Sequence, residues 1–242
     1  MEKEILFILL LSISGPIIGS LIGVSKKMSE RIMYNMLAFS AGVMLAISFL
    51  ELIPLSIKIS SIYITLIGVF IGSLFMLIIE MTIPHIHVEK CQKKNKQMKR
   101  TALYLLIGLF FHNIPEGMTI AAGLASNIKS SMIIALAIAI QKIPEGICTS
   151  APNYYCSQKR MRSFIISSLT IIPLIIGFLI GHFIINNTSN LIIGIMTSIT
   201  AGLMIYITAD ELIPASSKKL TNHNTIFSVI LGILLVIFLK SL

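Results

Sequence analysis

HNIPEG at residues 112–117 and QKIPEG at residues 141–146 are two versions of one motif, 29 residues apart. Each motif lies inside a long apolar run, Thr101–Ala125 for the first and Lys129–Ala151 for the second. A helix of roughly 20 apolar residues spans the hydrocarbon core of a bilayer. Both runs therefore predict membrane-spanning helices that carry charged residues within the membrane.

The polar residues of each motif fall on one face of its helix. Residues four apart stack on a helix, so His112 lies above Glu116 and Gln141 lies above Glu145. Ionisable groups inside a bilayer are costly and usually serve a function. Imidazole, carboxylate and amide ligands around one point suit zinc or a similar first-row divalent ion. The paired motifs therefore predict a metal site.

Each motif also has a proline directly before its glutamate. Proline removes one backbone hydrogen bond, which frees the carbonyls of Phe111 and Ile140 and predicts broken helices that line a cavity. Gly117 and Gly146 would allow the two helices to approach closely. The alternative is a pair of kinked helices whose polar groups only satisfy one another. The doubled motif, with a ligand residue four before each glutamate, favours the metal site.

The whole chain has the composition of a membrane protein. It is 55% hydrophobic and 12% charged, with a mean hydropathy of +0.92, far from the usual make-up of a soluble domain. We expect one transmembrane domain, residues 1–242, with a cytoplasmic loop at residues 84–100. The net charge of +9 does not indicate nucleic-acid binding, because the Lys and Arg residues sit mostly in loops.

An all-α integral membrane fold with eight transmembrane helices follows from the apolar segments. They are Ile5–Val24, Met33–Ile53, Ile59–Ile83, Thr101–Ala125, Lys129–Ala151, Ser163–Ile185, Asn190–Pro214 and Thr225–Leu239. Most of the 19 Lys and Arg residues fall in the loops after the first, third, fifth and seventh of these segments. Positive residues gather on the cytoplasmic side of membrane proteins, so we expect both termini to face outward.

A second repeat links the second and seventh helices. Residues 40–54 read SAGVMLAISFLELIP and residues 200–214 read TAGLMIYITADELIP, at a constant offset of 160. An even-numbered and an odd-numbered helix cross the membrane in opposite directions, so this is an inverted repeat, as in many secondary transporters. We expect three helices, a central pair and three inverted helices, a 3+2+3 arrangement.

The two PEG motifs and the AGVM…ELIP and AGLM…DELIP helices resemble the ZIP (Zrt/Irt-like) metal transporters. The absence of long insertions looks like the bacterial ZupT and GufA branches. The resemblance covers all eight helices and implies a homodimer in a bacterial plasma membrane with an elevator-like motion. It also implies transport toward the cytosol of Zn²⁺, and often of Fe²⁺, Mn²⁺ or Cd²⁺. We expect no cofactor besides the transported metal. As partners we expect membrane lipid and a second copy of the chain, and no nucleic acid.

The resemblance also implies roles for individual residues. It makes His112, Glu116, Gln141 and Glu145 the primary transport site, with Met44 as a soft ligand. In many members a second ion sits beside the first, bridged by the two PEG glutamates. The further ligand positions of that second ion correspond to Asn113, Lys142 and Glu211 here.

Lys142 departs from the family pattern, because this position is commonly Asp or Asn. An ammonium group does not ligate a metal. We hypothesise that Lys142 replaces the second ion by bridging Glu116 and Glu145, which leaves one metal site and lowers the buried charge imbalance. The alternative is that Lys142 turns toward the cytosol or the lipid headgroups.

Other polar residues give weaker signals. Glu51 and Glu211 occupy matching repeat positions, and with Asp210 they are candidates for the ends of the pathway or for simple interfacial carboxylates. In the loop after the third helix, His85, His87 and Cys91 could receive the metal on the cytoplasmic side or could merely be solvated.

Two other classes of protein are alternatives to a carrier. An intramembrane metalloprotease would need an HExxH-like motif, and the sequence has none, so we expect no enzymatic activity. An ion channel or a proton-coupled relay could use the same buried residues. Saturable, metal-dependent uptake would separate a carrier from both.

Overall fold

The computed structural model describes residues 2–25, 29–82, 113–217 and 223–241, and within these ranges the chain is helical with short connections and no strands. Two π-helical turns, η1 (Ser48–Leu52) and η2 (Thr208–Leu212), interrupt two of the helices, and residues 113–126 form one further helix. The remaining helices are α1 (Glu2–Ser25), α2 (Glu30–Ile47), α3 (Ile53–Ile59), α4 (Ile62–Thr82), α6 (Ile128–Ser157), α7 (Arg160–Ser168), α8 (Ile171–Asn187), α9 (Asn190–Ile207), α10 (Ile213–Ser217) and α11 (His223–Ser241).

Seven stretches of the described chain are long and apolar enough to cross a membrane. They are Lys3–Ser25, Arg31–Ile59, Ile62–Met81, Ile128–Ala151, Arg160–Asn187, Asn190–Ser216 and His223–Ser241. Each corresponds to one of the segments expected from the sequence. The other expected segment, Thr101–Ala125, lies half outside the described residues, which resume at residue 113. The protein is therefore an all-α membrane protein, as the sequence indicated.

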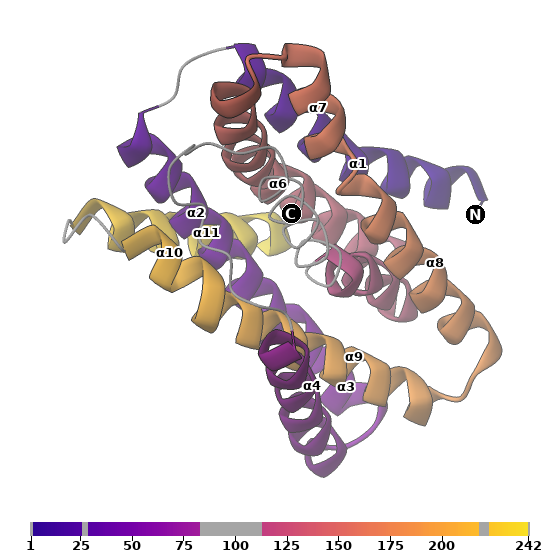
Figure 1. Ribbon diagram of the computed structural model, residues 1–242. Coiled ribbons are helices and arrows are strands. Elements are labelled where there is room, and N and C mark those ends of the chain that lie inside the picture. The colour runs from indigo at the N-terminus through magenta and orange to yellow at the C-terminus, as the bar shows by residue number, and fades with distance from the viewer. Residues whose placement is uncertain (1, 26–28, 83–112, 218–222, 242) are drawn as a thin grey trace.

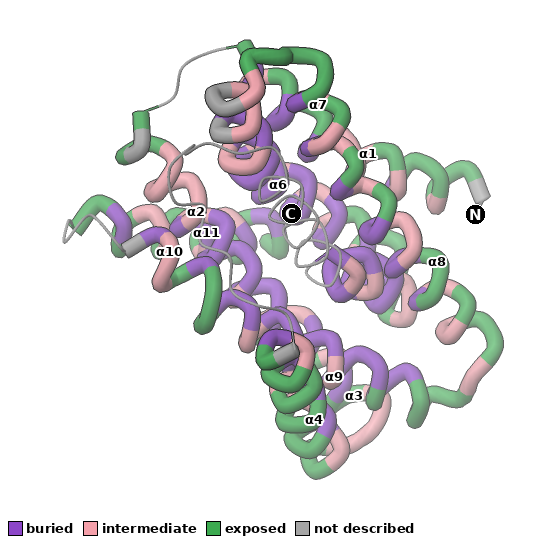
Figure 2. The backbone as a smooth tube through the Cα atoms, in the orientation of Figure 1, coloured by how far each residue is buried: buried purple, intermediate pink, exposed green. Residues whose placement is uncertain are grey.

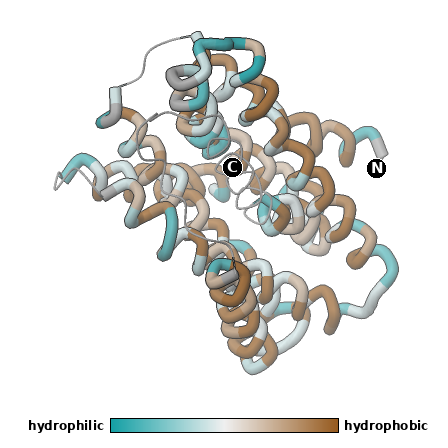
Figure 3. Tube along the Cα trace, in the orientation of Figure 1, coloured by the Kyte–Doolittle hydropathy of each residue, from teal (hydrophilic) through white to brown (hydrophobic). Residues whose placement is uncertain are grey.

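The outer surface of the molecule is apolar, as a bilayer requires. On α4, the side chains of Tyr63, Phe70 and Met81 are 75%, 68% and 78% exposed, although two of them are strongly apolar. Figure 2 shows buried residues running through the inner helices α6 and α9, and Figure 3 shows strongly hydrophobic residues on the outward helices α4 and α8. Apolar side chains of this size are exposed over whole helices because lipid, not water, covers them.

The helices fall into two groups. α1 packs along α6 and also contacts α7 and α8, whereas α4 packs along α9 and α11 packs along α2. In Figure 1, α1, α7 and α8 lie toward the upper right, α2, α10 and α11 toward the left, and α3 and α4 at the bottom. Between the groups, α2 packs against α6, and Oγ1 of Thr119 in residues 113–126 lies 3.0 Å from Sδ of Met204 on α9. We call α1, residues 113–126, α6, α7 and α8 the first group, and the other helices the second group.

Close backbone contacts inside the second group come in reciprocal pairs. A Cβ atom on Gly42 of α2 would collide with the carbonyl oxygen of Val229 on α11, and one on Gly202 of α9 would collide with that of Val69 on α4. Gly42 and Gly202 are 160 residues apart, and so are Val69 and Val229. The two helix pairs therefore use one glycine-based contact twice, which lets their backbones touch.

The first group contains a similar pair. A Cβ on Gly19 of α1 would collide with the carbonyl oxygen of Ile143 on α6, and one on Gly177 of α8 would collide with that of Ile114. Ile114 and Ile143 occupy the same place in the two PEG motifs. Each PEG motif therefore packs against a glycine of a different helix, the first against α8 and the second against α1.

The two π-helical turns also match. Ile53 donates its backbone N–H to Ser48, and Ile213 donates to Thr208, each across five residues. Pro54 and Pro214 follow directly, and a proline offers no N–H to the carbonyl four residues before it. π turns of this kind are frequent at functional sites. Glu51 and Glu211, the carboxylates singled out in the sequence, lie inside these turns.

The expectation of broken helices at the PEG motifs is wrong for α6, which continues through Pro144 without interruption. The observed break lies between α7 and α8 instead, before Pro173. The carbonyl of Leu169, which would bond to residue 173, accepts from the N–H of Ile172 at 3.1 Å instead. A proline interior to a helix can thus be absorbed by a bend or can divide the helix, depending on what packs around it.

We expect Gly42→Val and Gly202→Val to destabilise the protein to similar extents. Both changes push a side chain into a backbone carbonyl, and overpacking a close contact typically costs about 1–3 kcal/mol. The measurement is the thermal unfolding midpoint of purified protein in detergent. Ile67→Val is the control, because Ile67 is 59% exposed. Equal midpoints for the glycine variants and the control would contradict the close contacts.

Candidate metal site

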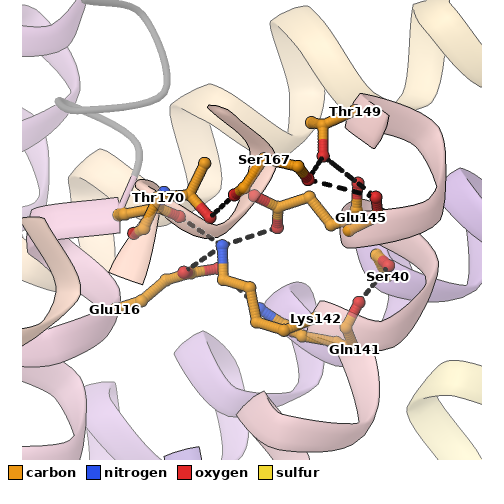
Figure 4. Close-up of polar contacts among 10 residues, drawn as sticks. Ser40, Glu116, Gln141, Lys142, Glu145, Thr149, Ser167 and Thr170 are labelled. Atoms are coloured by element: carbon orange, nitrogen blue, oxygen red, sulfur yellow. Dashed lines mark hydrogen bonds and ion pairs between the residues drawn. The ribbon is translucent and has the colours of Figure 1, made fainter. Parts of the chain in front are cut away.

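Lys142 lies at the centre of a buried cluster formed by α6 and residues 113–126. Its Nζ atom is 2.5 Å from Oε2 of Glu116 and 2.6 Å from Oε2 of Glu145. It also donates a hydrogen bond to Oδ1 of Asn113. The side chain of Lys142 is fully buried, and Figure 4 shows its ammonium group between the two glutamates. Lys142 therefore does not turn toward the cytosol or the lipid headgroups, and that alternative is wrong.

The charges of the cluster nearly balance. Two carboxylates and one ammonium leave one negative charge in a region that the helices seal from solvent. Taking a charge out of water is expensive unless an opposite charge and hydrogen bonds compensate for it. Here the ammonium group has two carboxylates and one amide oxygen as acceptors, which matches its three N–H donors. The helix pair can therefore hold three ionisable groups within the membrane.

Gln141 binds Glu116 and leaves one acceptor unused. Its Nε2 atom donates to Oε1 of Glu116 at 2.6 Å, which turns its Oε1 atom away from that carboxylate. Within the described part of the chain, no donor reaches this buried oxygen. A buried acceptor without a donor is uncommon in folded proteins and calls for an explanation. A cation bound next to this oxygen atom would explain the missing donor.

The orientation of Asn113 is set by the break between α7 and α8. Its Nδ2 atom donates to the backbone carbonyl of Thr170 at 3.2 Å, while its Oδ1 atom accepts from Lys142. Thr170 lies between the two helices, and its hydroxyl donates back to the carbonyl of Ser167 at 2.8 Å. The amide of Asn113 therefore presents its oxygen, not its nitrogen, to the cation position.

Hydroxyl groups tie the Glu145 end of α6 to the neighbouring helices. Ser20 of α1 donates to Ser167 of α7 at 2.8 Å, and Ser167 and Thr149 of α6 lie 2.5 Å apart. Thr149 donates to the carbonyl of Glu145 at 3.0 Å and Ser167 donates to that of Gly146 at 3.3 Å. Figure 4 shows the Ser167–Thr149 part of this series of hydrogen bonds. It joins three helices at the point where Glu145 enters the cluster.

Met44 lies on the α2 face that meets α6. Ser40, one turn earlier, donates to the backbone carbonyl of Gln141 at 2.9 Å, and residues four apart share a face of a helix. Met44 itself is buried. The structure therefore brings α2 against the cluster at this position, and the sulfur ligand role of Met44 stays a prediction.

The carboxylates of the π turns are not bonded to Asn113 or Lys142 among the described residues. Asp210 and Glu211 are exposed in the isolated chain, and no hydrogen bond or ion pair joins Glu211 to Asn113 or Lys142 among the described residues. Glu51 instead pairs with Lys240 of α11, with 3.2 Å between Oε1 and Nζ. The grouping of Glu211 with Asn113 and Lys142 therefore stays a prediction.

Four residues of the sequence-based site lie outside the described residues, namely His112, His85, His87 and Cys91. Within the described ranges, no three His, Cys, Asp or Glu side chains gather closely enough to hold a metal ion. The proposed ligand set combines two glutamates with His112, so this finding leaves that set untested.

Three features of the structure were not anticipated from the sequence. The carbonyl of Thr170 holds Asn113, Lys240 pairs with Glu51, and the hydroxyl of Tyr206 donates to Oε2 of the buried Glu80 at 2.6 Å. The sequence contains a signal for Glu80 and Lys240: they occupy matching positions of the repeat, 160 residues apart, and carry opposite charges.

The fold and the site define a class of protein: a multi-pass helical membrane protein with a charged cluster buried between its helices, which is typical of proteins that move or sense ions. A sequence model described as the ZIP zinc transporter family matches residues 80–240. The chain belongs to this family, in its ZupT-like branch.

Individual relatives agree with this assignment. The chain is 32% identical to the "Zinc transporter ZupT" of Chlorobium chlorochromatii, with 96% of each chain covered. It is 29% identical to proteins of the same name from Escherichia coli and Salmonella heidelberg, with 94% of this chain and 92% of each relative covered. The similarity therefore extends over nearly the whole chain.

Proposed function

We propose that this protein carries divalent metal ions, zinc by preference, across the bacterial plasma membrane toward the cytosol. The ion binds between α6 and the helix of residues 113–126, with His112, Glu116, Gln141 and Glu145 as ligands and Met44 as a sulfur ligand. The observation that carries this proposal is the buried Oε1 atom of Gln141, which has no donor among the described residues although the amide nitrogen of the same side chain holds Glu116. Fe²⁺, Mn²⁺ and Cd²⁺ are the other ions that such a donor set accepts. The names of the ZupT relatives support the same cargo.

Lys142 takes the place of a second metal ion in this proposal. Its ammonium group contacts both PEG glutamates and the Asn113 oxygen, which are the groups expected around such an ion. Glu211, which lies in η2 near the inner end of its transmembrane helix, completes the arrangement when the carrier changes conformation. The transported ion then has one site, and Lys142 supplies the fixed positive charge beside it.

The proposed architecture has eight transmembrane helices in one domain, arranged 3+2+3 with both termini outside. The reciprocal contacts of Gly42 and Gly202, and the matching π turns η1 and η2, support two related three-helix units. The equivalent packing of Gly19 and Gly177 against the PEG motifs supports a central pair that belongs to both units. Two such chains form a homodimer.

Transport follows an elevator-type motion of the first group against the second. Glycine contacts fix the helices within each group, whereas α2 against α6 and Thr119 against Met204 are contacts between the groups. Glu51 lies at the outer end of the pathway and Asp210 at the inner end. The loop with His85, His87 and Cys91 receives the ion on the cytoplasmic side.

Uptake into proteoliposomes tests the proposed function. We expect saturable, zinc-dependent uptake by the wild-type protein, and a loss of about 10-fold to 100-fold or more in Glu116→Gln, because a direct ligand matters at least as much as an outer-shell partner. The measurement is the initial rate with radioactive zinc at several concentrations.

The control is Glu4→Gln, the same chemical change at an exposed position near the end of α1. Its uptake should equal that of the wild type. Uptake that rises linearly with concentration without saturation would favour an ion channel, and proton flux without metal flux would favour a proton relay. Either result would overturn the carrier proposal.

A further inference from the structure

A pocket of about 230 Å³ lies at the end of α2 that carries η1. One wall comes from the second group of helices, including Leu50, Glu51, Lys58 and Lys240, and the other from the first group, including Ser126. The pocket therefore opens along the seam between the two groups. In the proposed orientation this is the outer face of the membrane.

Lys240 binds two oxygen atoms of η1 beside this pocket. Its Nζ atom donates to the backbone carbonyl of Leu50 at 2.6 Å and lies 3.2 Å from Oε1 of Glu51. The carbonyl of Leu50 is available because residue 54, four positions later, is a proline without an N–H. A carboxylate and a free carbonyl are also ligands for hard divalent cations. The ammonium group thus occupies a pair of oxygens that a metal ion could use.

The interaction of Lys240 is easily exchanged. Its side chain is 49% exposed, against 17% for Glu51, and ion pairs at this degree of exposure contribute little to stability. A cation that arrives from solvent therefore competes with a weakly held ammonium group. The buried Lys142, by contrast, has no such access.

The lysine is specific to one end of the molecule. Glu51 and Pro54 match Glu211 and Pro214 at the offset of 160, but the residue that matches Lys240 is Glu80. At that end the partner of Glu80 is the hydroxyl of Tyr206. The repeat therefore supplies a built-in cation next to η1 and a carboxylate in the matching place near η2.

We propose that this pocket is a capture site for incoming divalent cations, with Glu51 and the Leu50 carbonyl as ligands, and that Lys240 masks the site until a cation displaces it. This inference deepens the proposed function and depends on it for the direction of entrance. Lys240 holds the two oxygens in place when no metal is present and moves away when one binds.

Thiol protection tests the capture site directly. Ser126 is replaced by Cys in a chain in which Cys91, Cys148 and Cys156 are replaced by Ser, and modification by a membrane-impermeant thiol reagent is followed at increasing Mn²⁺. Manganese is the probe because it prefers oxygen ligands over thiols. We expect Mn²⁺ to slow the modification, and Lys240→Met to lower the half-protecting concentration by about fivefold or more, as removal of a competitor requires.

Two variants separate competition from general electrostatics. Glu51→Gln should abolish protection by Mn²⁺. Lys58→Met is the matched control, because it removes a positive charge from the same pocket wall without removing a ligand competitor, and it should shift the half-protecting concentration much less than Lys240→Met. An equal shift in both lysine variants, or protection that survives Glu51→Gln, would overturn the proposal. Size-exclusion profiles in detergent establish that each variant is folded.

A third variant separates this inference from the transport proposal. Glu116→Gln disables the central cluster but leaves the pocket intact, so protection by Mn²⁺ should persist in this background. If protection persists while wild-type uptake fails, the capture site stands and the carrier proposal falls. If protection disappears with Glu116→Gln, the ion acts through the central cluster and the capture site is wrong.

Discussion

A chain that carries both Glu116→Gln and Glu145→Gln should be destabilised by about 3–5 kcal/mol, because the ammonium group of Lys142 is then a buried charge without a counter-ion. Each single variant keeps one of the two ion pairs and should lose less. The measurement is the unfolding midpoint of purified protein in detergent. Expression in the membrane should fall in the same order.

Adding Lys142→Met to the double variant should restore most of the lost stability. This change removes the unpaired charge and fills the space with a side chain of similar length, and an apolar replacement of a buried ion pair is often neutral or stabilising. If the triple variant is as unstable as the double variant, the charge balance around Lys142 is not what holds α6 against residues 113–126.

Replacing Lys142 by Asp should change the number of metal ions bound per chain from one to two. The aspartate removes the tethered cation and adds a carboxylate next to Glu116, Glu145 and Asn113, which is an oxygen-rich set that suits a divalent ion. Metal content after equilibrium dialysis against Zn²⁺, measured by elemental analysis, gives the number directly. Calorimetric titration gives the two affinities.

Lys142→Met is the control for this experiment. It removes the positive charge but supplies no ligand, so we expect one tightly bound ion per chain. Two ions bound by the wild-type protein would show that Lys142 does not replace a metal. Equal binding by the Asp and Met variants would show that charge alone, without a ligand at position 142, decides the stoichiometry.

Local sequence patterns predicted much of the fold. The apolar segments marked the membrane helices, because the thickness of the bilayer sets their length. The contact between Lys142 and the two glutamates was one of two alternatives that the sequence left open, because a buried charge needs a partner but a long side chain can also reach the membrane surface. The structure bears out this contact, while the metal ligands themselves remain a prediction.

Features that depend on packing between distant segments escaped the sequence. Pro144 and Pro173 look alike in the chain, yet α6 continues through the first while α7 and α8 separate before the second. The π turns come shortly before Pro54 and Pro214, but a proline alone does not specify a π turn, because none forms before Pro144. The carbonyl of Thr170 holds Asn113 only because that helix break faces residue 113. No local pattern specifies such a juxtaposition.

The tethered ammonium group of Lys142 has a consequence for the response to membrane voltage. Without cargo, two glutamates and one lysine give the cluster one negative charge, and a bound divalent ion turns this into one positive charge. An electrical potential that is negative inside the cell then pulls the loaded cluster inward and pushes the empty cluster outward, each by about 2.3 kcal/mol per 100 mV for a full crossing. The resting potential therefore favours both the inward movement of the loaded cluster and the outward return of the empty one, which is the direction that accumulates metal in the cell.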